Sequence, residues 1–207
     1  MGYRINVKNA AIAEVTEDTN EGYELGEVIQ LPGLMHIDLS LLMANGELYG
    51  DGALSSKISK ITGAVIKFGI NKVPLEGRVL LNGSTLTEDG ILDISTEDQP
   101  KKVAFYAETE GDDGNKEQLW ALAGKAQPFG VSAKQSEGNI TYSTDEVTID
   151  FTRRKLDKKV VRLGDTEYKK FTEEKSKAFA LHPDMKTPVT GSTGETESGE
   201  STETTTD

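Results

Sequence analysis

Residues 35–43 read MHIDLSLLM, a run in which apolar and polar side chains alternate with a period of two. The apolar positions would share one face of an extended chain: Met35, Ile37, Leu39, Leu41 and Met43. His36, Asp38 and Ser40 would share the opposite face. A helix, with about 3.6 residues per turn, would spread both sets around its surface. The run therefore predicts a β-strand with one packed face and one face in water.

The same alternation recurs along the chain, which predicts a mainly β fold. Residues 61–70 and 140–151 show it most clearly, and shorter candidate strands occupy residues 4–8, 11–15, 103–107 and 118–126. Dipeptides that favour positive φ punctuate the chain: Asn45-Gly46, Asp51-Gly52, Asn82-Gly83, Asp89-Gly90 and Asp113-Gly114. Many short strands joined by such turns predict a β-sandwich or partial barrel.

Two helices are expected beside the strands. Residues 74–81, PLEGRVLL, open with a proline that suits a first helical turn and end before Asn82-Gly83. Residues 165–181 place aromatic side chains near helical spacing, with Asp165 or Thr166 as the N-cap. We expect the first helix to be short and the second to flank the β body through one apolar side.

The sequence changes character between residues 42 and 59, LMANGELYGDGALSSKIS, which hold three glycines and few β-branched residues. A long, weakly structured insertion inside a small β-domain is usually functional. This segment is therefore the candidate interaction loop. The residues chosen for contact lie at its centre: Asn45, Glu47, Leu48, Tyr49 and Asp51.

Acidic side chains outnumber basic ones by 35 to 23, for a formal net charge of -12. This excess disfavours tight binding to nucleic acid or to an anionic membrane. Residues 187–207 hold five acids and no Lys or Arg, and consist almost wholly of Thr, Ser, Gly and Glu. Such a segment cannot offset the entropy of ordering. We predict a folded domain over residues 1–183 and a disordered acidic tail over residues 184–207, either a solvated terminus or a partner-binding arm.

Residues suited to catalysis or metal binding are sparse. The chain has no cysteine, which excludes thiolate metal sites, and its 2 histidines, His36 and His182, cannot form a multi-histidine site without help from carboxylates. The sequence contains neither a phosphate-binding glycine loop nor a hydrolase nucleophile motif. Residues 112–115, DDGN, resemble part of a calcium loop but lack its closing glutamate, so they predict a hairpin turn. We expect no enzymatic activity, no cofactor and no metal.

Other functional classes find little support in the sequence. A carbohydrate-binding β-sandwich would need a patch of exposed aromatic side chains, and the chain has 1 Trp and 6% aromatic residues. A hydrolase with paired carboxylates, such as Asp89 and Asp93, would need a cleft that no motif marks. No apolar run approaches the ~18 residues of a membrane span, so no membrane partner is expected.

A basic cluster interrupts the acidic background, formed by Arg153, Arg154, Lys155, Lys158, Lys159 and Arg162. A basic patch on an acidic protein favours contact with the acidic face of another copy. We therefore predict an inter-subunit patch formed by Arg153, Arg154, Lys155 and Lys158. A solvated turn is the second interpretation, and phosphate contact is the third.

An ordered set of short segments is shared with a known family. These segments are residues 17–23 (EDTNEGY), 31–33 (LPG), 48–52 (LYGDG), 73–76 (VPLE), 103–105 (VAF) and 119–122 (LWAL), followed by Gly124-Lys125. In their order and spacing, residues 3–160 resemble the major tail protein family of long non-contractile-tailed bacteriophages. The acidic tail lies outside the resemblance.

The resemblance implies a β-sandwich subunit with a flanking helix, which forms six-membered rings that stack into a phage tail tube. Inner strands of neighbouring subunits would join into one barrel, and a long loop at residues 42–59 would reach the adjacent ring. The implied partners are further copies of the chain, the tape measure, the tail terminator and the distal tail protein. The implied location is the virion, after synthesis in the bacterial cytoplasm.

The same family implies that double-stranded DNA passes through the lumen of the tube without specific binding. If Asp38 and Asp150 line this lumen, their carboxylates repel the phosphates of passing DNA. Repulsion would then be a function, because a channel that bound many phosphates would stall ejection. A tube protein of a contractile tail, or of a phage-derived secretion device, would share the subunit fold and is the alternative assignment.

Overall fold

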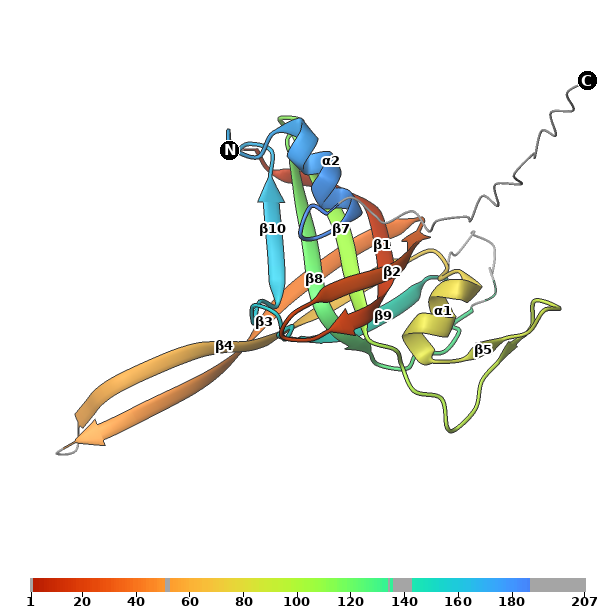
Figure 1. The fold of residues 1–207 in the computed structure, drawn as a ribbon, viewed down its shortest axis with the longest axis horizontal. Coiled ribbons are helices and arrows are strands. Elements are labelled where there is room, and N and C mark those ends of the chain that lie inside the picture. The colour runs from red at the N-terminus through yellow and green to blue at the C-terminus, as the bar shows by residue number, and fades with distance from the viewer. Residues whose placement is uncertain (1, 51–52, 134, 136–142, 187–207) are drawn as a thin grey trace, which may run out of the picture.

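The computed structural model describes residues 2–50, 53–133, 135 and 143–186, and the fold is mainly β, as predicted (Figure 1). The long strands are β1 (Arg4–Asp18), β2 (Tyr23–Leu31), β3 (Leu34–Gly50), β4 (Ala53–Ile70), β7 (Val103–Gly111), β8 (Lys116–Ala126), β9 (Asp145–Thr152) and β10 (Val161–Asp165). A small second sheet pairs β5 (Thr85–Leu86) with β6 (Leu92–Asp93). The helices are α1 (Leu75–Asn82) and α2 (Glu173–Leu181).

The long strands form one 8-stranded antiparallel sheet in the order β2-β1-β7-β8-β9-β4-β3, with β10 attached to β8. Two strands, β10 and β9, pair with different parts of the same edge of β8. Residues 117–121 pair with β10, and residues 123–126 pair with β9. The sheet therefore parts along β8, so that β9, β4 and β3 can turn across the face of β1, β7 and β8.

The main core lies between these two parts of the sheet. Ile66 and Phe68 of β4 and Ile149 of β9 meet Ile12 of β1 and Phe105 of β7, and all five are fully buried. The rings of Phe68 and Phe105 stack with centroids 4.8 Å apart. The inward positions predicted from alternation in residues 61–70 and 145–151 are thus confirmed as core.

A second core occupies the opposite face of β1, β2, β7 and β8, where α2 covers it. Trp120 and Tyr106 pack with ring centroids 5.1 Å apart. The indole N–H of Trp120 donates a hydrogen bond to the backbone oxygen of Phe179, 2.5 Å away. This bond ties α2 to the middle of β8, and it confirms that the second helix flanks the β body.

The predicted boundaries agree with the structure for the first helix but not for the start of the second. Helix α1 begins after Pro74 and is capped by Gly83, whose φ of 78° is left-handed, so it lies close to the predicted limits. Helix α2 begins only after Thr172, because residues 161–165 pair with β8 as a strand. The predicted N-caps Asp165 and Thr166 are therefore wrong. Backbone pairing with β8 outweighs helical propensity in this segment.

A close approach fixes the path between β10 and α2. A Cβ atom added at Gly164 would lie 2.4 Å from Cζ of Phe171, whose ring packs edge-on against Phe179 with centroids 5.7 Å apart. Any side chain at position 164 would displace the Phe171 ring from the α2 core. Glycine is therefore required at this position by packing.

Gly164→Ala should lower the free energy of unfolding by about 1–3 kcal/mol, because the added methyl group overpacks this contact. Gly130→Ala is the matched control, since a Cβ at Gly130 meets nothing within 4 Å. It should leave stability unchanged or raise it slightly. Chemical denaturation followed by Trp120 fluorescence measures both, and equal stabilities for the two variants would contradict the packing role.

Candidate assembly surfaces

Strands β3 and β4 form one long antiparallel hairpin, paired from Leu34 opposite Ile70 to Gly50 opposite Ala53. The two strands leave the body together and project well beyond it (Figure 1). Residues 42–50 and 53–59 continue the strands, so the predicted weakly structured insertion is wrong. Pairing with the opposite strand overrides the low β-propensity of this segment. The predicted turn at Asn45-Gly46 is likewise part of β3.

The apolar stripe of β3 continues past the core onto this hairpin. Ile37 and Leu39 pack against the main core, whereas Leu41 is 47% exposed and Met43 is 61% exposed. Ile61, directly opposite Met43, is 52% exposed. Directly opposed residues of an antiparallel pair share a face of the sheet. We call Leu41, Met43 and Ile61 the hairpin stripe, an extension into water of the stripe that is buried in the body.

Farther out, the hairpin is held by polar cross-strand contacts. The hydroxyl of Ser59 donates to the side-chain oxygen of Asn45 at 2.7 Å. Lys57 Nζ lies 3.0 Å from Glu47 Oε1. The two predicted contact residues Asn45 and Glu47 thus help to hold the strands together.

The other predicted contact residues lie near the tip. Leu48 and Tyr49 belong to β3 and pair with Ser56 and Leu54, although their side chains are outside the described part of the structure. Asp51 lies outside the described residues altogether. The structure therefore places four of the five predicted residues on one strand, and their contacts with another copy stay a prediction.

The two acids predicted to face a lumen lie on one polar face of the sheet. Asp38 of β3 and Asp150 of β9 are separated by β4, where they are paired with Lys67 and Val65 respectively. Both acidic residues are exposed. The alternating pattern of these two strands thus brings residues far apart in sequence onto a common surface, which we call the polar face.

Basic groups that the sequence did not reveal share the polar face. Lys67 lies opposite Asp38, and Lys125 of β8 lies opposite Asp150. A further pair joins the face where His36 Nε2 lies 3.3 Å from Glu146 Oε2. At these described cross-strand positions the carboxylates of Asp38, Glu146 and Asp150 lie beside Lys67, Lys125 and His36. The charges on this part of the polar face therefore nearly cancel.

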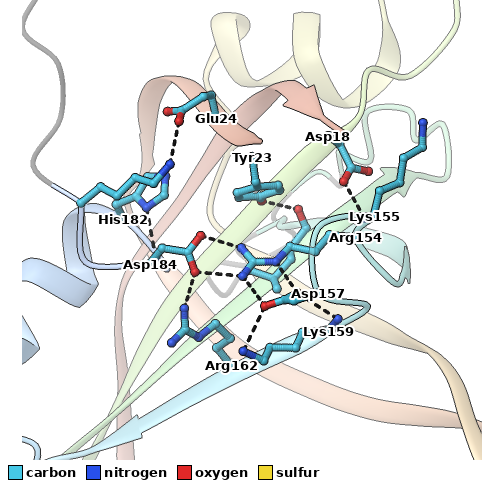
Figure 2. Close-up of polar contacts among 12 residues, drawn as sticks. Asp18, Tyr23, Glu24, Arg154, Lys155, Asp157, Lys159, Arg162, His182 and Asp184 are labelled. Atoms are coloured by element: carbon cyan, nitrogen blue, oxygen red, sulfur yellow. Dashed lines mark hydrogen bonds and ion pairs between the residues drawn. The ribbon is translucent and has the colours of Figure 1, made fainter. Parts of the chain in front are cut away.

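The predicted inter-subunit basic patch is corrected by the burial of Arg154. This residue is 1% exposed, and its guanidinium lies between two carboxylates (Figure 2). It donates to Asp157 at 2.7 and 2.6 Å and to Asp184 at 2.7 and 2.9 Å. Its Cζ lies 4.8 Å from the ring centroid of Tyr23. Arg154 is therefore an internal anchor and presents no charge to a neighbouring copy.

The remaining predicted members of the patch, Arg153, Lys155 and Lys158, are exposed. They surround a turn in which the backbone N–H of Lys158 donates to the oxygen of Arg154 at 3.1 Å. We refer to residues 153–159 as the basic loop. Its exposed cations stay candidates for contact, whereas the buried Arg154 holds the loop in place.

The residues that follow α2 bind the same group of charged side chains around Arg154, which we call the Arg154 network. Asp184, which falls within the predicted tail, pairs with Arg162 as well as with Arg154. Lys186 Nζ lies 2.7 Å from Glu24 Oε1 on β2. These contacts hold the chain to the body up to Lys186, three residues beyond the predicted domain boundary, and residues 187–207 lie outside the described part.

Arg154 lowers the pKa of the two aspartates that it binds. Hydrogen bonds from Arg154 hold the pKa of Asp157 below its usual range. Burial disfavours the charged form of Asp184, but the hydrogen bonds and charge of Arg154 outweigh burial and lower its pKa as well. Both aspartates are therefore ionised partners of Arg154 in the folded protein at neutral pH.

A separate buried carboxylate is also fully occupied within the fold. Glu108 accepts hydrogen bonds from the hydroxyl of Tyr106 at 2.5 Å, from Gln118 at 2.9 Å and from Asn9 at 2.7 Å. Burial raises its pKa, but these bonds outweigh burial, so the net pKa is lowered. A buried acid with a lowered pKa and three donors is a structural acceptor and a poor general acid.

The described residues offer no group of three His, Asp or Glu side chains arranged to hold a metal ion. Neither helix of the described part is long and apolar enough to cross a membrane. No protein-family model matches this chain, and no curated protein sequence matches it. The surfaces of the described chain that bear on function are the hairpin stripe and the polar face.

Arg154→Gln should lower the free energy of unfolding at pH 7 by about 3–5 kcal/mol, because it removes a buried cation that binds two carboxylates. Asp157 and Asp184 would keep only Lys159 and Arg162 as cationic partners. Arg153→Gln removes an exposed guanidinium next to it in the chain and is the matched control. The control should change stability by less than about 0.5 kcal/mol. Urea denaturation measures both, and similar losses for the two variants would contradict the anchoring role.

The same network predicts a pH dependence. Asp157 and Asp184 have lowered pKa values in the folded state, so their contribution is present above the ordinary value of 3.8 and is lost as the pH falls through the folded values. Stability of the native chain should therefore fall steeply between about pH 4 and pH 2. Arg154→Gln should flatten this fall, and parallel curves for the two proteins would argue against the assignment.

Proposed function

We propose that this chain is the tube subunit of a long non-contractile phage tail, in which copies form six-membered rings that stack around a DNA channel. The observation that carries the proposal is the uncovered hairpin stripe on the projecting β3–β4 hairpin. The resemblance of residues 3–160 to the major tail protein family supplies the type of assembly. The mainly β body with its flanking helix agrees with that assignment.

The hairpin stripe requires a covering surface. Leu41, Met43 and Ile61 are adjacent on one face, and each is about half exposed or more. Contiguous apolar patches on soluble proteins mark interaction sites, whereas scattered single exposures do not. Because the hairpin projects from one part of the body, a second copy would meet it with a different surface. Such head-to-tail contacts generate rings or open stacks of subunits.

The ends of the sheet are suited to joining copies laterally. Within the described chain, β3 is paired only with β4, and β2 is paired only with β1. Each of these two edges leaves backbone donors and acceptors that another strand can bind. Pairing between copies would close the sheet into a ring and remove both edges.

The polar face is suited to a channel that does not hold DNA. Asp38, Glu146 and Asp150 are interspersed with Lys67 and Lys125 on neighbouring strands. Each lysine lies beside a carboxylate, so a phosphate group would meet compensating charges at short range. We therefore propose that the polar face has a low affinity for DNA because its carboxylates neutralise its lysines, and that it does not act by repulsion alone.

Met43→Ser combined with Ile61→Ser should abolish or sharply weaken self-association, because it makes the hairpin stripe polar at its most exposed cross-strand pair. Ile91→Ser combined with Ile94→Ser is the matched control, since these residues are 59% and 71% exposed outside the hairpin. Sedimentation velocity over a concentration series measures assembly. Assemblies from the control and monomers from the hairpin variant are expected.

Two results would contradict the proposal. One is normal assembly of the Met43→Ser, Ile61→Ser variant. The other is loss of assembly in both variants to the same degree, which would indicate general sensitivity to lost apolar surface. Circular dichroism and thermal melting of each variant show whether the fold is retained before assembly is compared.

Asp38→Lys combined with Asp150→Lys should slow or arrest genome delivery by particles that carry the variant. The polar face would then hold four lysines and one carboxylate at these positions, where the native chain has two lysines and three carboxylates. Asp89→Lys combined with Asp93→Lys makes the same change in net charge on the exposed β5–β6 region. Ejection measured by dye uptake into released DNA compares them. Equal ejection by both variant particles would count against the channel assignment of the polar face.

A further inference from the structure

The last described residues of the chain and the basic loop are joined through the buried side chain of Arg154. Arg154 of the loop is joined to Asp184 by paired hydrogen bonds, and Lys186 is joined to Glu24 (Figure 2). Arg153 and Lys155 flank Arg154 in the chain, so their Cα atoms lie about 3.8 Å from that of Arg154. The chain thus continues past Lys186 from the same group of charged side chains that holds the basic loop.

The basic loop presents more positive charge than its contacts neutralise. Arg153, Lys155 and Lys158 are exposed and form no ion pair with a described side chain, whereas Lys159 is paired with Asp157. The nearby Asp18 is already engaged, because it binds Lys102 Nζ at 3.0 Å and the backbone N–H of Lys155 at 2.7 Å. Three cations within six residues therefore face water.

The segment that continues from Lys186 has the complementary charge. Residues 187–207 carry five acids, Glu195, Glu197, Glu200, Glu203 and Asp207, and no Lys or Arg. We propose that the basic loop is a docking surface for residues 187–207 of the same chain, held by charge complementarity. The tail would then shield the loop from other polyanions.

The length of the chain favours this partner over a free polyanion. The first acid of the tail, Glu195, follows Lys186 by nine residues, which span up to about 30 Å when extended. The acids of the tail are therefore confined to the surroundings of Lys186, whose neighbour Asp184 is bound to Arg154 of the basic loop. Tethering at Lys186 also gives the tail a high effective concentration at the loop, in the millimolar range for short linkers.

A second group of exposed lysines provides a comparison. Lys169 and Lys170 precede α2 and are exposed, but they lie close in sequence to Glu167, Glu173 and Glu174. This neighbourhood carries charges of both signs, and Glu173 is itself paired with Lys177 Nζ at 3.0 Å. The basic loop instead has one acid, Asp157, which is bound by Arg154 and Lys159. The tail is therefore expected to select the basic loop.

Zero-length carbodiimide cross-linking of the full chain tests the proposal, because it joins a carboxylate to a lysine amine only in direct contact. Trypsin then releases residues 187–207 as one peptide, since cleavage follows Lys186 and the tail has no Lys or Arg. We expect this peptide to be joined mainly to Lys155 and Lys158. In 0.5 M salt the yield should fall by about fivefold, because the contact is screened.

Isotope mixing identifies the occupant. Equal amounts of ¹⁴N- and ¹⁵N-labelled chain are combined before cross-linking, and joined peptides of a single isotope are expected from contact within one chain. Arg153→Gln combined with Lys158→Gln should reduce joining at Lys155, whereas the matched control, Lys169→Gln combined with Lys170→Gln, should not. Mixed-isotope peptides, or equal joining to distant lysines such as Lys72 and Lys177, would overturn the proposal.

Discussion

The hairpin stripe, Leu41, Met43 and Ile61, is exposed to solvent because β3 and β4 extend beyond the core that covers Ile37 and Leu39. Full burial of a large aliphatic side chain contributes about 1.5–3 kcal/mol of favourable free energy, so an uncovered apolar stripe favours association. The strands cannot bury it themselves, since both form the same two-stranded hairpin. A well-packed body fixes the base of the hairpin, and in the proposed assembly a second copy covers its outer part.

Charge has a different part in the structure from the one that composition suggests. Arg154, the central residue of the basic cluster, is enclosed by Asp157 and Asp184 and stabilises the body internally. The polar face likewise sets Lys67 and Lys125 beside carboxylates. In both places opposite charges are matched within one chain. Apolar contact at the hairpin stripe and strand pairing are therefore the main proposed links between copies, while the exposed cations of the basic loop stay candidates for charged contact.

Sequence periodicity predicted most of the strands and the inward residues of β4 and β9, because alternation with a period of two reports which residues share a face. Of the five apolar positions in residues 35–43, only Ile37 and Leu39 pack against the core, whereas Met35, Leu41 and Met43 are exposed. Periodicity also placed Asp38 and Asp150 on the wet side of their strands. It did not reveal Lys67 and Lys125 beside them, since cross-strand register depends on pairing between distant segments. The burial of Arg154 was missed for the same reason: its partner Asp184 lies 30 residues away. Residues 42–59 were misjudged because strand pairing overrides local propensity. The second helix was begun too early because residues 161–165 pair with β8 and turns follow them before Thr172.

Negative-stain electron microscopy of the concentrated, purified full chain tests the proposed assembly most directly, since it needs neither a partner protein nor a substitution. We predict rings with six-fold symmetry or hollow tubes built from stacked rings, with the hairpin of each subunit reaching a neighbouring ring. Particles that stay single subunits at high concentration, with no ring or tube in any field, would contradict the proposal.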